Sequence, residues 1–496
     1  MRHLAHFFLQ CLLAISTSTA ATAADPVRAL RSDLIAILSD SRLADAQLAV
    51  EVLSLDRAEV LFEKNSRKLF IPASNNKILT AAAALVCLGP DYCFKTQVWA
   101  DGPIRDGALE GDLIIKGFGD PSSSSRIQPK DPYRPFRDWP VKLKQHGITS
   151  ISGKIIGDGG AFESTEHGRG WAWDDLAEGY AAPVSALQFN ENLVELEIAP
   201  GLKLGSVAPI KSSPLENYLN LDVRVITESE DASSRIDIER SAGNEAVAVR
   251  GAIALKSAPV YRNVSVQFPI LYYLSALKRI LSGEGIKASG CEILQVRDYR
   301  RPSSSMLWVH ASPPLAELLA PIMKNSLNLG CETLTRVLGL ELRGEGSFAK
   351  GKEVVEDALL RMGIGRESYA YFDGSGLSRL NLVSADAVVR ILKFMHRQTY
   401  FPAFYNSLAV AGVDGTLASR LKSAKTINNV HAKTGSFANV SALSGYIRTA
   451  DSETLAFSIL ANNFLVSRSL VEDMQEKALA RLAGFSRKVQ KKSIKR

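Results

Sequence analysis

Two kinds of apolar spacing divide this chain of 496 residues into three stretches. From about Thr96 to Val296, apolar and polar residues alternate in short segments that Gly, Ser and Pro separate, as they do in half-buried strands. The clearest segments are 109–116, 194–198, 221–226 and 247–254. The sequence therefore predicts a β-rich region of about 200 residues in the middle of the chain.

Both flanks of this region mix helical and strand patterns. Before it lie an amphipathic helix, a β-hairpin and an Ala- and Leu-rich helix that follows Pro72, in the segments 27–46, 48–63 and 72–89. After it come four helical and two strand patterns, in the segments 315–319, 332–342, 354–362, 385–395, 441–447 and 454–460. We therefore expect one discontinuous α/β domain, 24–95 and 305–486, interrupted by a β-rich inserted domain, 96–304.

The N-terminus has the layout of a secretory signal peptide. Arg2 and His3 precede an apolar stretch, 4–15, and small residues end at Ala21-Thr22-Ala23. The apolar stretch is shorter than the roughly 20 residues that a membrane-spanning helix needs. We therefore expect residues 1–23 to be removed and the protein to be exported to the periplasm.

Positive charge is concentrated at the two ends of the chain. Arg2 and six basic side chains among the last ten residues account for the formal net charge of +7. The neutral body provides no field that gathers phosphates, which excludes nucleic-acid binding as the main function. The tail, 487–496, has few apolar residues, so we expect at most a weak electrostatic association with the anionic envelope.

Cysteines and histidines give little sign of a metal site. Cys87 and Cys93 flank a turn-forming sequence, and either a disulfide or two free thiols at a helix end fits this spacing. The histidines that follow the signal peptide form no H-E-x-x-H motif and no Cys/His cluster. The sequence therefore predicts neither a metal nor a cofactor.

Three short motifs follow one another in a fixed order: Ser74-x-x-Lys77, Ser326-x-Asn328 and Lys433-Thr434-Gly435. Each is weak alone, since Ser-x-x-Lys also occurs at Ser275, Ser347 and Ser419, and Ser74 can be interpreted as a helix cap. Only Ser74 follows a Pro-Ala pair, opens an apolar helix and precedes the other two motifs. This order in an exported chain indicates a catalytic site.

Ser74 and Lys77 suit nucleophilic catalysis. Residues i and i+3 share a helix face, so Lys77 can reach the Ser74 hydroxyl and act as its base. The lysine needs a lowered pKa, which burial and a second cation such as Lys433 can provide. Asn328 can orient Lys77 or the substrate amide, and Ser326 can relay a proton to the leaving amine.

Gly435 is expected on an edge strand, where a substrate backbone can approach and pair. The neighbouring Thr434 and Ser436 are then further substrate-binding residues. We expect the backbone N–H groups of Ser74 and Ser436 to form an oxyanion hole.

The three motifs resemble those of the penicillin-interacting serine enzymes. The chain is most similar to the D-alanyl-D-alanine carboxypeptidase/endopeptidase group of low-molecular-mass class C penicillin-binding proteins, the penicillin-binding protein 4-like group. The segments that carry this narrower resemblance are 117–121, 171–176, 182–186, 312–315 and 373–379. Leu327 departs from the family, where Asp is frequent, and we expect this to alter local packing rather than chemistry.

The resemblance implies an antiparallel sheet with helices on both faces, interrupted by the β-rich insertion. It also implies an acyl-enzyme on Ser74, peptidoglycan stem peptides and cross-links as substrates, and inhibition by β-lactams. In similar enzymes an Asp of the inserted domain and an Arg help to hold the side chain of the peptide substrate. The resemblance implies that Asp158 and Arg379 take these two positions here. From the residues alone, Asp158 is equally a turn residue, and Arg379 can be a structural ion-pair partner.

Two other functions remain compatible with the motifs. A β-lactamase shares them and differs in fast deacylation, although the sequence assigns no acidic residue as its deacylating base. A catalytically inactive wall-binding scaffold is the alternative from another class, and the presence of all the catalytic side chains argues against it.

Overall fold

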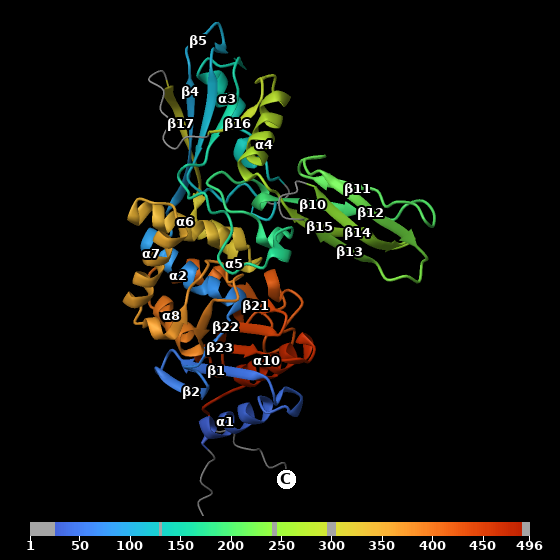
Figure 1. Ribbon diagram of the computed structural model, residues 1–496. Coiled ribbons are helices and arrows are strands. Elements are labelled where there is room, and N and C mark those ends of the chain that lie inside the picture. The colour runs from blue at the N-terminus through green and yellow to red at the C-terminus, as the bar shows by residue number, and fades with distance from the viewer. Residues whose placement is uncertain (1–24, 128–130, 241–245, 295–303, 489–496) are drawn as a thin grey trace, which may run out of the picture.

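The computed structural model describes residues 25–127, 131–240, 246–294 and 304–488. The expected signal peptide lies outside these residues. Figure 1 shows a core domain at the bottom, an inserted domain above it, and a lobe formed by strands β10 to β15 that projects to one side. None of the helices in the described ranges is long and apolar enough to cross a membrane.

A six-stranded antiparallel sheet organises the core domain, in the order β2-β1-β23-β22-β21-β20. Its strands are β1 Gln47–Ser54, β2 Glu59–Lys64, β20 Ala409–Val410, β21 His431–Phe437, β22 Val440–Arg448 and β23 Thr454–Asn462. The first strand of the chain pairs with the last along its whole length, from Gln47 opposite Asn462 to Ser54 opposite Leu455. The predicted hairpin and the two C-terminal strands are therefore confirmed as parts of one sheet.

Helices cover both faces of this sheet. The helices are α1 Pro26–Ile37, α2 Lys77–Leu88, α5 Leu315–Lys324, α6 Asn328–Arg343, α7 Phe348–Arg361, α8 Ala385–His396, α9 Phe401–Ser407 and α10 Arg468–Ala483. One hydrophobic core joins the sheet to α1 and α10, and a second joins it to α2 and α5 to α9. Residues 78–85 of α2 are buried all round because this helix lies inside the second core. The expected α/β architecture, with helices on both faces of an antiparallel sheet, is confirmed.

The inserted domain is rich in strands, as predicted. Its main sheet has the order β16-β9-β7-β4-β17, from Cys291–Ile293, Ile155–Asp158, Asp112–Gly117, Cys93–Asp101 and Ser304–Pro314. The projecting lobe contains β10 Leu193–Ile198, β11 Ile210–Ser213, β12 Leu221–Glu228, β13 Arg235–Glu239, β14 Val247–Ala254 and β15 Val260–Ser265. Two helices, α3 Trp139–Gln145 and α4 Pro269–Gly283, pack into the same core and were not foreseen.

The boundaries of the insertion differ slightly from the expected ones. Strand β17 pairs with β4 as far as Pro314 opposite Cys93, so the inserted sheet spans 93–314 rather than 96–304. The two strands are adjacent only in three dimensions, and no local pattern marks their ends. Cys87 and Cys93 are free thiols, with Cys87 Sγ 3.0 Å from an Arg361 guanidinium nitrogen, so the disulfide alternative is absent from this structure.

Asn462 ties the last strand to the segment that leads to Ser74. Its buried side-chain amide accepts a hydrogen bond from the Ile71 N–H at 2.8 Å and donates to the Ile71 carbonyl at 3.1 Å. The side chain thus supplies both backbone hydrogen bonds of Ile71 that a neighbouring strand would otherwise make.

We expect Asn462→Ala to lower the free energy of unfolding of the core domain by about 1–3 kcal/mol, because it leaves the half-buried N–H and carbonyl of Ile71 without these partners. Differential scanning calorimetry checks this. An unchanged melting temperature would show that Ile71 finds other partners and would contradict the structural role given to Asn462.

Candidate active site

Ser74 lies on the single 3₁₀ turn η2, Ala73–Asn76, which leads directly into α2. Three residues complete a 3₁₀ turn, so the side chains of Ser74 and Lys77 lie one above the other. Lys77 Nζ is 2.9 Å from Ser74 Oγ. Ala73 has φ +46°, a left-handed conformation that is unusual for a residue with a side chain. This backbone conformation directly precedes Ser74, which is half-buried.

Two further oxygens surround Lys77 Nζ. The Asn328 side-chain oxygen lies 2.6 Å away, and the Ser375 carbonyl oxygen lies 2.7 Å away. A neutral amine has two N–H groups and one lone pair. If the amide and carbonyl oxygens accept the two N–H groups, the lone pair points at the Ser74 hydroxyl and can take its proton.

Burial makes this proton transfer possible. Lys77 is fully buried, and desolvation lowers its pKa, although the charges of Cys331, Asp373 and Glu332 oppose the shift. The pKa of Lys433 lies well below its usual value, first because of burial and then because of repulsion by Lys77. Burial therefore makes the neutral form of each lysine more accessible than it is in water.

A second serine–lysine pair faces the first. Lys433 Nζ is 2.9 Å from Ser326 Oγ, and Ser326 has φ +57° between α5 and α6. Leu327, where the family often has Asp, is buried in the hydrophobic core. Its side chain packs away from the chemistry, while Ser326 and Asn328 on either side face the lysines.

The outer edge of β21 is available to a substrate. Within the described residues, β20 pairs only with His431 and Ala432 of β21. A side chain on Gly435 would come within 2.5 Å of the Pro72 carbonyl oxygen and 2.9 Å of Ser74 N, so only glycine lets this strand lie against the nucleophile turn. Beyond it, Ser436 is exposed, and Thr434 donates a 2.8 Å hydrogen bond to Thr416.

Asp158 and Arg379 are not brought together. The carboxylate of Asp158 is buried, 3.5 Å from Lys116 Nζ, and accepts from Gly160 N at 2.9 Å. It borders a pocket of about 210 Å³ whose lining includes no predicted catalytic residue. These contacts are compatible with the turn-residue interpretation of Asp158. Exposed Arg379, in contrast, lies over the ring of Phe437 at the end of β21, 4.9 Å from its centroid.

A segment of the inserted domain reaches the catalytic groups. Asn328 donates through Nδ2 to the Tyr180 carbonyl at 2.8 Å, and the Tyr180 hydroxyl donates to Asp175 at 2.6 Å. Trp171 donates to Asp373 at 2.9 Å, beside Ser375. The sequence contains Asp175 within 171–176, but its distance from Ser74 along the chain gives no sign of this position.

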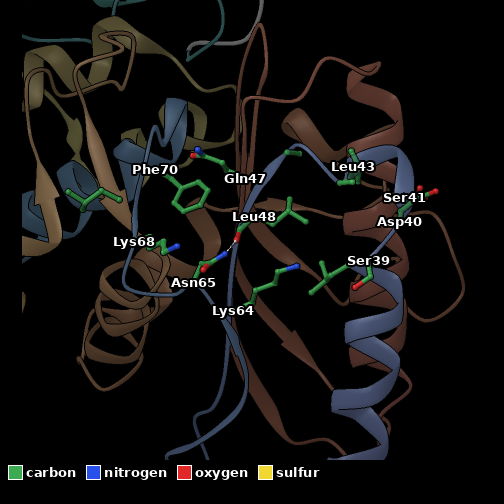
Figure 2. Close-up of a pocket in the computed structure, with 14 residues that line it drawn as sticks. Ser39, Asp40, Ser41, Leu43, Gln47, Leu48, Lys64, Asn65, Lys68 and Phe70 are labelled. Carbon is green, nitrogen blue, oxygen red and sulfur yellow. Dashed lines mark hydrogen bonds between the residues drawn. The ribbon is translucent and has the colours of Figure 1, made fainter.

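A pocket of about 550 Å³ lies elsewhere on the core domain, between the end of α1 and the strands β1, β2 and β3 (Leu69–Phe70) (Figure 2). Leu38, Leu48 and Phe70 give it apolar walls, and Lys64 and Lys68 supply amines. None of its lining residues belongs to the catalytic cluster, so this pocket is separate from the Ser74 site.

Comparison with known proteins shows similarity to one family, to one curated relative and to two solved structures of a second relative. The sequence signature of the D-Ala-D-Ala carboxypeptidase 3 (S13) family matches residues 30–484. A D-alanyl-D-alanine carboxypeptidase of Actinomadura sp. (strain R39) is 32% identical over 486 residues, covering 95% of this chain and 88% of that protein. The crystal structure of penicillin binding protein 4 (dacB) from Haemophilus influenzae aligns with a TM-score of 0.77 and 27% identity, over 90% of this chain and 97% of that one. The same protein complexed with a novel β-lactam aligns with a TM-score of 0.71 and 25% identity, over the same shares of the two chains.

Proposed function

Because the chain belongs to the D-Ala-D-Ala carboxypeptidase 3 (S13) family and is a serine-type D-Ala-D-Ala carboxypeptidase, we propose that Ser74 is its acylated nucleophile and Lys77 the base. The observation that carries this assignment is the position of Lys77 Nζ, held by Asn328 and Ser375 within 2.9 Å of Ser74 Oγ.

Acylation breaks the peptide bond between the last two residues of a stem peptide. Ser74 Oγ attacks the carbonyl carbon of the penultimate D-Ala while its proton moves to Lys77 Nζ. The N–H groups of Ser74 and Ser436 receive the developing oxyanion. The C–N bond then breaks, and the departing amine takes its proton from Ser326, which Lys433 supports. The proton that Lys77 accepted then passes to Ser326, so that both groups regain their starting forms.

Deacylation restores the enzyme. Water attacks the Ser74 ester, releases the shortened peptide and returns the proton to the serine. A β-lactam enters the same reaction as a cyclic amide, but its amine remains attached to the acyl group after the ring opens. The relative complexed with a β-lactam supports inhibition by this route. The family match favours a peptidase over a β-lactamase or an inactive scaffold.

Penicillin labelling tests the nucleophile. Intact-mass analysis after exposure to a penicillin is expected to give one adduct on the natural chain and none on Ser74→Ala, because Ser74 lies on the turn that leads into α2, with Lys77 Nζ 2.9 Å from its hydroxyl to act as the base. Ser419→Ala is the matched control, since this exposed serine also begins a Ser-x-x-Lys sequence. An adduct that survives Ser74→Ala would overturn the assignment.

We further propose that Asp175 and Arg379 recognise the side chain of the stem peptide. A diaminopimelate residue presents a free amine and a carboxylate, which suit an acidic and a basic partner. Asp175 accepts from the hydroxyl of Tyr180, whose backbone carbonyl accepts from Asn328, and Arg379 flanks the end of β21. Asp158 meets the amine of Lys116 instead.

Selectivity between two substrates tests this proposal. Asp175→Ala and Arg379→Ala should each lower kcat/KM for a diaminopimelate peptide on the order of tenfold to a hundredfold, while acylation by a penicillin that lacks the side chain changes little. Asp158→Ala is the comparison variant and should affect both substrates equally through stability. Equal losses on both substrates in the Asp175 variant, or a selective loss in the Asp158 variant, would reverse these roles.

We propose that residues 1–23 direct export to the periplasm, and that a basic tail associates weakly with the anionic envelope. Arg487 is not part of a free tail, because its guanidinium binds Glu453 at 2.9 Å and Glu59 at 2.7 Å. The proposed tether therefore consists of Lys488 and the residues after it.

Deletion of residues 489–496 tests the tether without disturbing Arg487. We expect lower cosedimentation with envelope fragments, a difference that added salt removes, and unchanged activity on soluble peptides. Cosedimentation equal to that of the full chain at low salt would contradict the tether.

A further inference from the structure

Glu332 lies one helical turn after Asn328 on α6 and is 1% exposed. Its Oε1 accepts a hydrogen bond from the Ser375 N–H at 2.8 Å. The carbonyl of the same Ser375 lies 2.7 Å from Lys77 Nζ. One buried carboxylate thus holds the residue that provides an oxygen to the catalytic lysine.

The far side of Glu332 faces Arg336, which is also buried. Glu332 Oε2 is 3.6 Å from an Arg336 guanidinium nitrogen. Arg336 in turn donates to the Thr165 carbonyl at 3.1 Å and lies 3.7 Å from Glu163, both on the segment that follows β9. The carboxylate is therefore held between the inserted domain and the Ser375 loop.

Contacts within the loop set most of its shape. Asp373 accepts from Gly376 N at 2.6 Å, Ser378 N at 2.5 Å and Asn381 Nδ2 at 2.8 Å. These contacts close the loop on itself. Glu332 adds only the bond to Ser375, whose carbonyl faces Lys77.

We propose that Glu332 is a positioning residue that orients Lys77 through Ser375 and places a negative charge beneath it. The inference rests on the proposed role of Lys77 as the base. With Ser375 fixed, the Lys77 lone pair is directed at Ser74 rather than shared among alternative partners.

The charge of Glu332 predicts the direction in which the pH dependence of acylation shifts when this residue is replaced. The charged and titratable groups that face Lys77 are Lys433 from β21, Asp373 from the loop, and Cys331 and Glu332 from α6. Burial and the neighbouring Asp373 raise the pKa of Glu332 to about 7, while Arg336 opposes this shift. An ionised Glu332 stabilises the protonated form of Lys77, so its removal lowers the pKa of Lys77 further. Acylation needs neutral Lys77, and its rate therefore rises at a lower pH when that charge is lost.

The test measures the second-order rate of acylation by a fluorescent penicillin across a pH series. Glu332→Ala should lower the maximal rate on the order of tenfold, because the Ser375 N–H loses its partner. Glu332→Gln retains an oxygen for that N–H and should recover most of the rate, with the rising limb of the pH profile displaced to lower pH. Glu341→Ala, at an exposed glutamate of the same helix, should match the natural chain in both respects.

A pH limb in Glu332→Gln that coincides with that of the natural chain would overturn the proposal, even if Glu332→Ala fails to fold. Acylation of a folded Glu332→Ala variant at the natural rate would also overturn it. The natural chain in the same assay separates this inference from the proposed function. Absence of an adduct there contradicts the role of Ser74 and Lys77, and with it this inference, whereas an adduct with unaffected Glu332 variants contradicts this inference alone.

Discussion

The structure depends on one buried amine and the three oxygens around it. Lys77 Nζ touches Ser74 on η2, Asn328 at the start of α6 and the Ser375 carbonyl on a third segment. Burying a lysine is unfavourable unless it is neutral or fully partnered. The fold meets this requirement by bringing together segments that are far apart in the chain. The same burial lowers the pKa of Lys77, as a lysine that acts as a base requires.

The insertion leaves this arrangement intact because it starts and ends as a pair of strands. β4 leaves the core domain and β17 returns beside it, so helices α2 and α5 on either side remain in one hydrophobic core. The insertion also sends one segment back to the site, where the Tyr180 carbonyl accepts from Asn328. The active site is therefore built by both domains, although the two lysines and their serines all come from the core domain.

The sequence predicts most of what side-chain patterns encode. The order of the three motifs identifies the residues around Lys77, and apolar spacing predicts the core sheet, its helices and the β-rich insertion. Features that depend on the pairing of strands far apart in the sequence were not predicted, for example the end of the inserted sheet at Pro314. The contact of the Ser375 carbonyl with Lys77 could not be predicted, because every residue has a carbonyl and only the fold decides which one faces a lysine. Asp158 and Asp175 both lie in polar segments, and nothing in either segment indicates which aspartate contacts Tyr180, whose carbonyl accepts from Asn328.

The pairing of β1 with β23 has a consequence for how the chain acquires its structure. Strand β1, which lies next to the edge strand β2, lacks its inner neighbour until almost the whole polypeptide has been made, because the residues opposite Gln47 and Ser54 lie near the far end of the chain. Contacts this remote in sequence close slowly. The inserted domain has a hydrophobic core of its own, and the pairing of β4 with β17 brings its two ends together. Once that domain has folded, Cys93 and Pro314 lie opposite each other, and the effective loop that the core sheet must close is shorter by the length of the insertion.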